Sequence, residues 1–268
     1  MKLAVAAVEL PRARRKLLAS PDLSESEKEL LRNVSLTVSL HDQMYVVTRA
    51  EHYLSVGLSA LRNIERALAA KGRGQPAAPA AILDFPCGHG RVLRFLRARF
   101  PETPITAVEL DATALEFCRV TFGTNALASS TNFDALNMPE RYGLIWCGSL
   151  ATHIDENATA ALLRFFYRQL LPGGTCVFTT HGLFSEELLR SGQARYGLTA
   201  QAEQSILSQY EKSGYGFAEY AGQSGYGISL VRPERLKEIA ASAGEWEQVL
   251  FAPRGWDHHQ DVSAYHKS

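Results

Sequence analysis

A short run of small residues between two apolar runs constrains the fold of this chain more than any other feature. The apolar run 81–83 ends at Asp84, a loop with Gly88 and Gly90 follows, and a helical pattern begins at Val92. This order is typical of a buried strand, a tight turn and the first turn of a helix. The start of a helix presents unpaired N–H groups, and glycine lets a ligand approach the backbone closely. The junction therefore predicts a site for a polar ligand, beside a carboxylate that would attract a cation and repel a diphosphate.

The composition favours one α/β domain with an appendage and argues against several kinds of partner. Among 268 residues, Lys plus Arg and Asp plus Glu both number 28, so no net charge recruits nucleic acid or an anionic membrane. The four cysteines form no C-x-x-C pair, and we expect neither a metal site nor a disulfide framework. No apolar run is long enough to span a membrane, and the first residues make a poor signal peptide. We expect a soluble, cytoplasmic protein.

Residues 1–75 are predicted to form an N-terminal helical cap and a linker. A capping box at Ser24 and Glu27 opens one helix, and apolar residues from 53 to 68 recur at helical spacing in another. The Gly- and Pro-rich stretch 71–79 is typical of a linker. His52 and Tyr53 could close a ligand site, although packing in the core explains this helix better.

Beyond the loop, strand and helix patterns alternate, which predicts βαβ units and a parallel sheet. The second strand, residues 105–109, ends at Glu109, about twenty residues after the loop, where a ribose hydroxyl pair needs an acceptor. Methyltransferases and NAD enzymes could both use this carboxylate. Asp111 is expected to cap the helix 112–122, and residues 126–130 are expected to form the third strand.

Asp84-x-x-x-Gly88-x-Gly90 resembles the first motif of class I S-adenosylmethionine-dependent methyltransferases, of the bacterial small-molecule type. Pro86 stands where that family usually has its first glycine. Residues 133–139 resemble the segment in which an acidic residue faces the adenine amino group, although an ordinary turn explains them equally well. Residues 142–150 resemble the fourth strand of the family, and 170–174 resemble the turn before its fifth strand.

The resemblance implies a doubly wound, seven-stranded, mostly parallel sheet of order 3-2-1-4-5-7-6, whose last strand is antiparallel. The methyltransferase domain would occupy residues 76–268, with a lid-like insertion at about 183–227. S-adenosyl-L-methionine is the implied cofactor, at the carboxyl ends of strands one to four. The residues expected to bind it are Asp84, Pro86, Cys87, Gly88, Gly90, Glu109, Leu110, Phe133, Asp134, Cys147 and Gly148.

Two histidines follow the fourth and fifth strands and are candidate catalytic residues. His153 could remove a proton from the acceptor as the methyl group transfers, with Asp155 orienting it, and His181 is the second candidate. A histidine that only stabilises the start of a helix is an equal alternative for His153. Positioning alone can supply several kcal/mol, so a base need not be essential.

The predicted function is methyl transfer to an oxygen or nitrogen of a small-molecule acceptor, sugar-containing acceptors included. DNA amino-methyltransferases resemble one another in an Asn/Asp-Pro-Pro-aromatic motif after the fourth strand, and this chain has Cys147-Gly148-Ser149-Leu150 there. An NAD-dependent oxidoreductase or epimerase is the first alternative. Asp84 argues against it, and so does Leu93, which stands at the third glycine position of the dinucleotide motif G-x-G-x-x-G. A catalytically silent binding module is the second, suggested by Pro86.

Overall fold

The computed structural model describes residues 2–70 and 78–268, and the predicted linker around residue 75 lies outside them. The N-terminal part contains α1 (Lys2–Leu18), α2 (Glu25–Asn33), η1 (Val47–Arg49) and α3 (Ala50–Ala69). The predicted capping box is confirmed, because the Ser24 hydroxyl accepts the Glu27 N–H while the Glu27 carboxylate accepts the Ser24 N–H. None of the described helices is long and apolar enough to cross a membrane.

The large sheet has seven strands in the order β3-β2-β1-β4-β5-β9-β8. Their bounds are β1 (Ile82–Asp84), β2 (Ile105–Glu109), β3 (Asn125–Ala128), β4 (Tyr142–Cys147), β5 (Leu170–Thr180), β8 (Trp246–Trp256) and β9 (Gln260–Lys267). β9 runs antiparallel to both β5 and β8, and the pairs among β1 to β5 are parallel. Counted without β6 and β7, which form a separate sheet, this is the predicted order 3-2-1-4-5-7-6.

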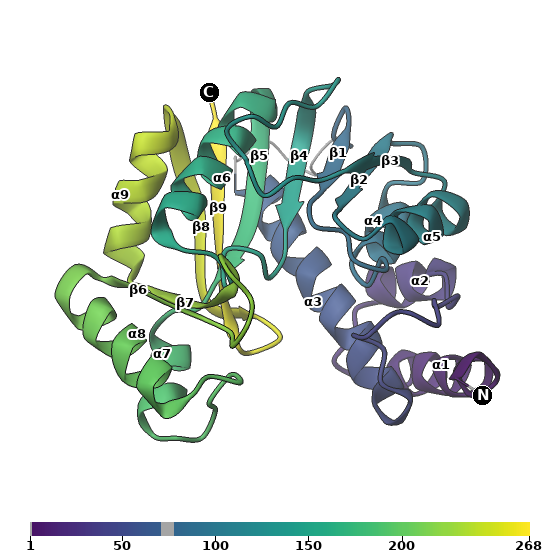
Figure 1. Ribbon diagram of the computed structural model, residues 1–268. Helices are drawn as coiled ribbons and strands as arrows, with labels where there is room; N and C mark the ends of the chain where they lie inside the picture. Colours follow the sequence, from purple (N-terminus) through teal and green to yellow (C-terminus); the bar gives the residue numbers. More distant parts are fainter. Residues whose placement is uncertain (1, 71–77) are drawn as a thin grey trace.

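Helices cover both faces of the sheet (Figure 1). On one face α3 packs with α4 (Leu93–Arg99) and α5 (Ala112–Phe122), and on the other α6 (Glu156–Gln169) packs with α9 (Pro233–Ala243). Successive strand residues alternate between the two cores, as the two-residue period of a strand requires: Leu144 and Trp146 belong to the first core and Ile145 to the second. Because α3 shares a core with the sheet, the N-terminal helices are part of the main structure.

The insertion after β5 contains more secondary structure than the sequence analysis predicted. It contains α7 (Leu183–Arg190), α8 (Ala200–Ser213), β6 (Tyr215–Glu219) and β7 (Gly227–Val231), with a small core of its own. The sequence analysis did not predict the antiparallel pair β6 and β7. Gly216 in β6 and Gly227 in β7 weaken the strand pattern. In Figure 1 the insertion lies beside the lower end of the sheet, opposite α1 and α2.

Two strand boundaries differ from the prediction. β3 ends at Ala128, two residues earlier than expected, so Ser129 and Ser130 leave the sheet. β5 begins at Leu170 and includes the expected turn, where Gly173 has a φ of 80° and the pairing with β4 shifts register.

Candidate functional site

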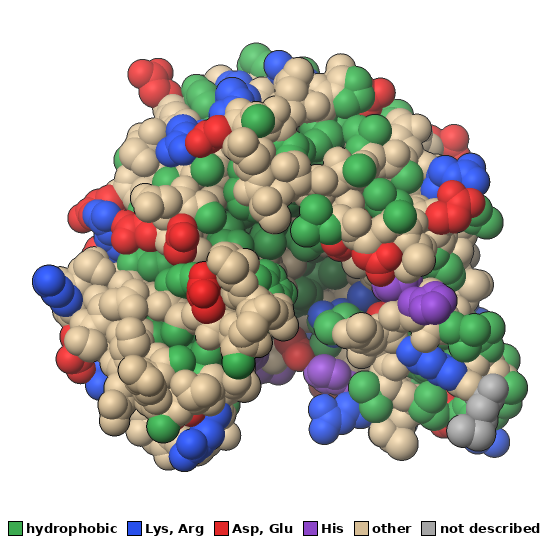
Figure 2. Space-filling model, in the orientation of Figure 1, with side chains coloured by type: hydrophobic (Ala, Val, Ile, Leu, Met, Phe, Trp, Pro, Cys, Tyr) green, Lys and Arg blue, Asp and Glu red, His purple; other side chains and the backbone are tan. Residues whose placement is uncertain are grey.

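Two connected cavities lie at the carboxyl ends of the parallel strands, where ligands bind in sheets of this kind. Cavity I, of about 620 Å³, lies between the ends of β1 to β3, residues 149–158 and the turn between β6 and β7. Cavity II, of about 210 Å³, lies between the glycine loop, the end of β4 and residues of the N-terminal part. Both share Pro86, Glu109, Ser149 and Tyr226. Figure 2 shows the molecule hollowed between the insertion and the N-terminal helices.

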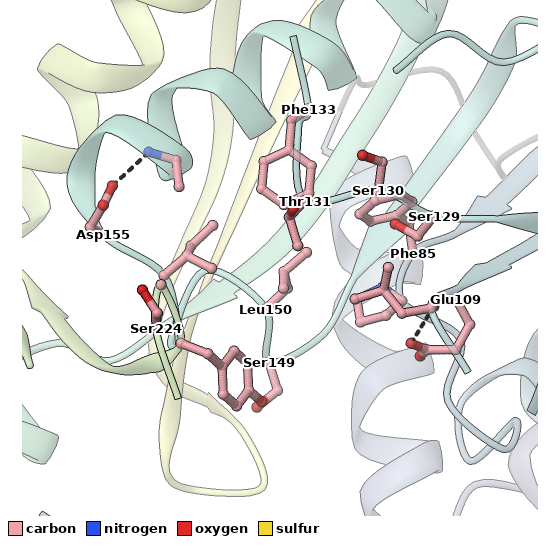
Figure 3. A pocket seen from close by; sticks show the side chains of 16 residues that line it. Phe85, Glu109, Ser129, Ser130, Thr131, Phe133, Ser149, Leu150, Asp155 and Ser224 are labelled. Carbon is pink, nitrogen blue, oxygen red and sulfur yellow. Dashed lines mark hydrogen bonds between the residues drawn. The ribbon is translucent and has the colours of Figure 1, made fainter. Parts of the chain in front are cut away.

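The loop after β1 is shaped by its glycines and tied to the end of β2. Gly88 and Gly90 have φ values of 50° and 77°, and a Cβ on Gly90 would lie 2.3 Å from the Phe122 ring. The Gly88 N–H donates to Glu109 Oε2 over 3.0 Å, and the Leu110 N–H donates to Oε1 over 2.7 Å. Each carboxylate oxygen keeps a lone pair for a ligand hydroxyl. Glu109 lines both cavities, and Figure 3 shows it among the residues of cavity I.

Asp84 lies beneath this loop and lines cavity II. Its side chain is 1% exposed, and Oδ2 has no hydrogen-bond partner among the described residues. Burial, reinforced by the nearby charge of Glu109, holds the pKa of Asp84 well above its usual value. A bound cation would offset the cost of ionising this carboxyl group.

Cavity I has a mixed apolar and hydroxyl wall (Figure 3). Phe133 and Leu110 supply apolar surface, and Ser129 and Ser130 supply hydroxyl groups. The sequence analysis overlooked these serines, although their position directly after a parallel strand was a usable signal.

The expected role of Asp134 does not fit its position. Its carboxylate accepts two hydrogen bonds from Arg164, of 2.8 and 3.1 Å, and it does not line cavity I. Since β3 ends early, Ser129, Ser130 and Thr131 line the part of cavity I where Asp134 was expected.

The other predicted cofactor residues line cavity I, cavity II or neither. Pro86, Cys87, Gly88 and Gly148 line cavity II, and Pro86, Leu110 and Phe133 line cavity I. Gly90 shapes the loop without lining either cavity. Cys147 is fully buried in the core and also lines neither cavity, because its side chain points to the face covered by α6.

His153 lines cavity II with one edge of its ring held by the backbone. Nδ1 lies 2.7 Å from the carbonyl oxygen of Gly227, and a carbonyl can only accept, so Nδ1 carries the proton. Burial lowers the pKa of His153, so the ring is neutral near pH 7 and its Nε2 keeps a lone pair. Asp155 does not orient it, because its carboxylate caps α6 by accepting the Ala158 N–H.

His181 does not fit the second catalytic role. It is 3% exposed, lines neither cavity, and its ring lies 6.3 Å from that of His153. Burial lowers its pKa to about 3, so the ring is neutral across the physiological range. Its position after β5 was identified correctly, but α7 and the insertion cover that end of the strand.

A buried network brings the N-terminal segment against the glycine loop. Arg94 is 1% exposed and donates to the carbonyl oxygen of Gly90, to those of Ser35 and Thr37, and to the Tyr53 hydroxyl. The Tyr53 hydroxyl in turn donates to Asp42 over 2.6 Å. This network holds Asp42 and Met44 in the wall of cavity II. His52 lies outside both cavities and pairs with Asp257.

Residues 82–174 match the family described as "Methyltransferase domain". The chain carries a class I methyltransferase domain. This confirms the family suggested by the glycine loop, and with it S-adenosylmethionine as the cofactor. Three features of the described residues fit this cofactor: the Asp84 oxygen without a hydrogen-bond partner, the glycine loop and the remaining lone pairs of Glu109.

A curated relative and two solved structures resemble this chain. Malonyl-[acyl-carrier protein] O-methyltransferase from Priestia megaterium is 33% identical over 104 residues, which is 38% of this chain and 37% of that protein. DesVI from Streptomyces venezuelae matches with a TM-score of 0.58 and 13% identity, over 87% of this chain and 100% of that one. Human N-acetylserotonin methyltransferase in complex with SAM matches with a TM-score of 0.52 and 13% identity, over 98% and 66%. The two structures support the fold.

Proposed function

We propose that this protein transfers a methyl group from S-adenosylmethionine to an oxygen or nitrogen of a small-molecule acceptor. The observation that carries the proposal is that cavity II joins two sets of groups. Asp84 and Glu109, which suit a sulfonium cofactor and its ribose, share this cavity with the neutral imidazole of His153. Cofactor residues alone would also suit a binding module, whereas the adjacent base favours catalysis.

The cofactor would lie across both cavities, and it supplies an electrophilic methyl group. Glu109 would accept hydrogen bonds from the ribose hydroxyls, and Phe133 and Leu110 would contact the adenine ring in cavity I. Asp84 and the loop at Gly88 would hold the amino-acid end and oppose its positive charge. Every one of these side chains belongs to the end of a strand or the loop that follows it, which brings them together at one edge of the sheet.

His153 would act as the general base. The cofactor would supply the methyl group, with the electron pair of the S–C bond left on sulfur. His153 Nε2 would take the proton that the acceptor oxygen or nitrogen loses as it becomes methylated. The hydrogen bond from Nδ1 to the Gly227 carbonyl strengthens as the ring becomes positively charged. Met44 and Tyr226 line the same cavity and would help to exclude water.

Calorimetric titration tests the cofactor part of the proposal. Purified protein is titrated with S-adenosylmethionine, S-adenosylhomocysteine and NAD, and Glu109→Gln is compared with the exposed control Glu102→Gln. We expect both sulfur compounds to bind, NAD not to bind, and only Glu109→Gln to weaken binding. Binding of NAD alone, or an unchanged affinity of Glu109→Gln, would contradict the proposal.

Release of S-adenosylhomocysteine with a panel of hydroxyl, amine and carboxylate acceptors tests the transfer itself. The malonyl-[acyl-carrier protein] relative makes a malonyl thioester a reasonable member of the panel. Tight cofactor binding without turnover on any acceptor would favour the silent binding module.

A further inference from the structure

Arg91 places its guanidinium group at cavity II, and within the described part of the chain this group has no hydrogen-bond or ion-pair partner. It follows Gly90 directly, lines the cavity, and its guanidinium carbon lies 5.6 Å from the ring centre of Trp256. Among residues 2–70 and 78–268, no hydrogen bond or ion pair joins this group to another residue. Burial lowers the pKa of Arg91 without neutralising it, because guanidinium stays charged in proteins.

The neighbouring arginines of the same segment are all engaged. Arg94 donates to three carbonyl oxygens and to Tyr53, Arg97 donates to backbone carbonyls near Phe122, and Arg99 pairs with Glu65 over 2.6 Å. A partly buried cation without a partner is costly, and a bound anion would offset that cost. Among these arginines, Arg91 alone has a guanidinium group that remains available to bind an anionic ligand.

The position of Arg91 favours the acceptor over the cofactor as the source of that anion. Arg91 lines cavity II only and lies over Trp256 of β8, whereas Glu109 lines both cavities. The carboxylates that act on the charge of Arg91 are Asp42 and Asp257. Both nearby carboxylates have other partners. Asp42 accepts from Tyr53 and from the Met44 N–H, and Asp257 pairs with His52 over 2.8 Å.

The surroundings of Arg91 suit a small molecule with an apolar body. Trp146 and Trp256 meet edge to face with ring centres 5.5 Å apart, and both line cavity II with Val92. The amino-acid end of the cofactor would share the volume of about 210 Å³, so only a small acceptor or the end of a larger one fits beside it. His153 lines the same cavity, so an anchored acceptor would present its reacting atom to the base.

We propose that Arg91 binds a carboxylate of the acceptor, and that the substrate is a small carboxylic acid with a separate hydroxyl or amine that receives the methyl group. The planar guanidinium forms two parallel hydrogen bonds to a carboxylate, which sets orientation as well as affinity. The hydroxyl or amine loses its proton to His153 Nε2 and gains the methyl group as the S–C bond breaks. This inference rests on the proposed methyltransferase function.

The test compares an acid with its neutral amide. Protein saturated with S-adenosylhomocysteine is titrated with phenylacetate and with phenylacetamide, and binding is followed by ligand-observed NMR. Arg91→Gln and Arg91→Lys are compared with the surface control Arg99→Gln, whose partner is Glu65. We expect the wild type and Arg99→Gln to prefer the acid, Arg91→Gln to lose at least tenfold of that affinity, and Arg91→Lys to keep part of it. Equal binding of acid and amide, or binding of neither, overturns the proposal.

A second arm separates the two possible sources of the anion. S-adenosylhomocysteine carries the amino-acid carboxylate, whereas 5′-methylthioadenosine lacks it. We expect Arg91→Gln to bind both as the wild type does. A selective loss of S-adenosylhomocysteine affinity would assign Arg91 to the cofactor and overturn the acceptor role. If S-adenosylhomocysteine binds to no variant and not to the wild type, the methyltransferase proposal itself fails.

Discussion

The Nδ1–H of His153 donates to the carbonyl oxygen of Gly227, with 2.7 Å between nitrogen and oxygen. The two backbones also pair, because the Gly227 N–H donates to the His153 carbonyl oxygen over 2.9 Å. The next ring, Tyr226, stacks on His153 with centres 4.9 Å apart. The insertion therefore orients the candidate base of the methyltransferase domain, and the two cannot be treated as independent parts.

The first prediction concerns His153 as the general base. His153→Ala should lower turnover by about 10²- to 10⁴-fold with little change in cofactor affinity, because the proton acceptor is lost. Steady-state kinetics and calorimetry measure the two quantities, with His52→Gln as a control outside both cavities. Because the pKa of His153 is lowered, the wild-type rate at saturating S-adenosylmethionine should fall only when the pH drops below the ordinary histidine pKa of about 6.5. An unchanged rate in His153→Ala would mean that positioning alone supports the reaction.

Tyr226 tests the contribution of the insertion. It lines both cavities and covers the ring of His153, so Tyr226→Ala should reduce both cofactor affinity and turnover, by about tenfold each. Tyr226→Phe keeps the stacked ring and should remain close to the wild type. Leu183→Ala, an exposed position at the start of α7, serves as the control. Equal behaviour of the Ala and Phe variants would argue against a role for the ring.

Asp84 should show opposite effects on stability and binding. The pKa of Asp84 is raised in the folded state, so its ionisation opposes folding. Its contribution to the free energy of unfolding is fully present below the pKa of the unfolded chain and is lost as the pH rises through the raised pKa. Asp84→Asn removes that loss, so its unfolding midpoint at pH 8 should equal or exceed that of the wild type. The same change should weaken S-adenosylmethionine binding by at least about tenfold, since the charge opposite the cation is gone.

Titrations of wild-type Asp84 at several pH values complete this test. The cofactor favours the ionised carboxyl group, so affinity should rise with pH until the raised pKa is passed, with proton release on binding. Calorimetry in buffers of different ionisation enthalpy measures that proton. A lower midpoint for Asp84→Asn together with full cofactor affinity would assign Asp84 a purely structural role.

The buried network around Arg94 should dominate the stability of the N-terminal part. Arg94→Met removes donors from four oxygen acceptors and leaves the Tyr53 and Asp42 groups less well satisfied. The expected loss is about 3–5 kcal/mol in the free energy of unfolding, measured with urea. The exposed pair of Arg12 and Glu9 provides the control, because Arg12→Met should change stability by less than about 1 kcal/mol. Similar losses of stability in Arg94→Met and Arg12→Met would contradict the stabilising role of the Arg94 network.

Much of the fold followed from local pattern. The order of strand and helix signals, the acid at the end of β1 and the acid at the end of β2 predicted a parallel sheet with a ligand at its carboxyl edge, since right-handed connections leave few other arrangements. Glu109 was identified for the same reason: its position depends only on where a strand ends. The boundary between the N-terminal part and the methyltransferase domain stays a prediction, although α3 shares a core with the sheet.

The direction of individual side chains was decided by tertiary contacts. Asp134 lay close to the expected place in sequence, but Arg164, thirty residues away, holds its carboxylate outside cavity I. His181 was covered by the insertion, and Tyr226 entered the site through strands that no pattern had indicated.

The sequence by itself thus determined the sheet, the glycine loop and the two carboxylates, because these depend on the two-residue period of strands and on the conformational freedom of glycine. Only the tertiary structure decided that the Gly227 carbonyl accepts from His153 Nδ1 and that Arg91 has no hydrogen-bond or ion-pair partner among the described residues. Both depend on residues distant in sequence, Gly227 in one case and Asp42, Tyr53 and Trp256 in the other, whose positions relative to the loop emerge from packing.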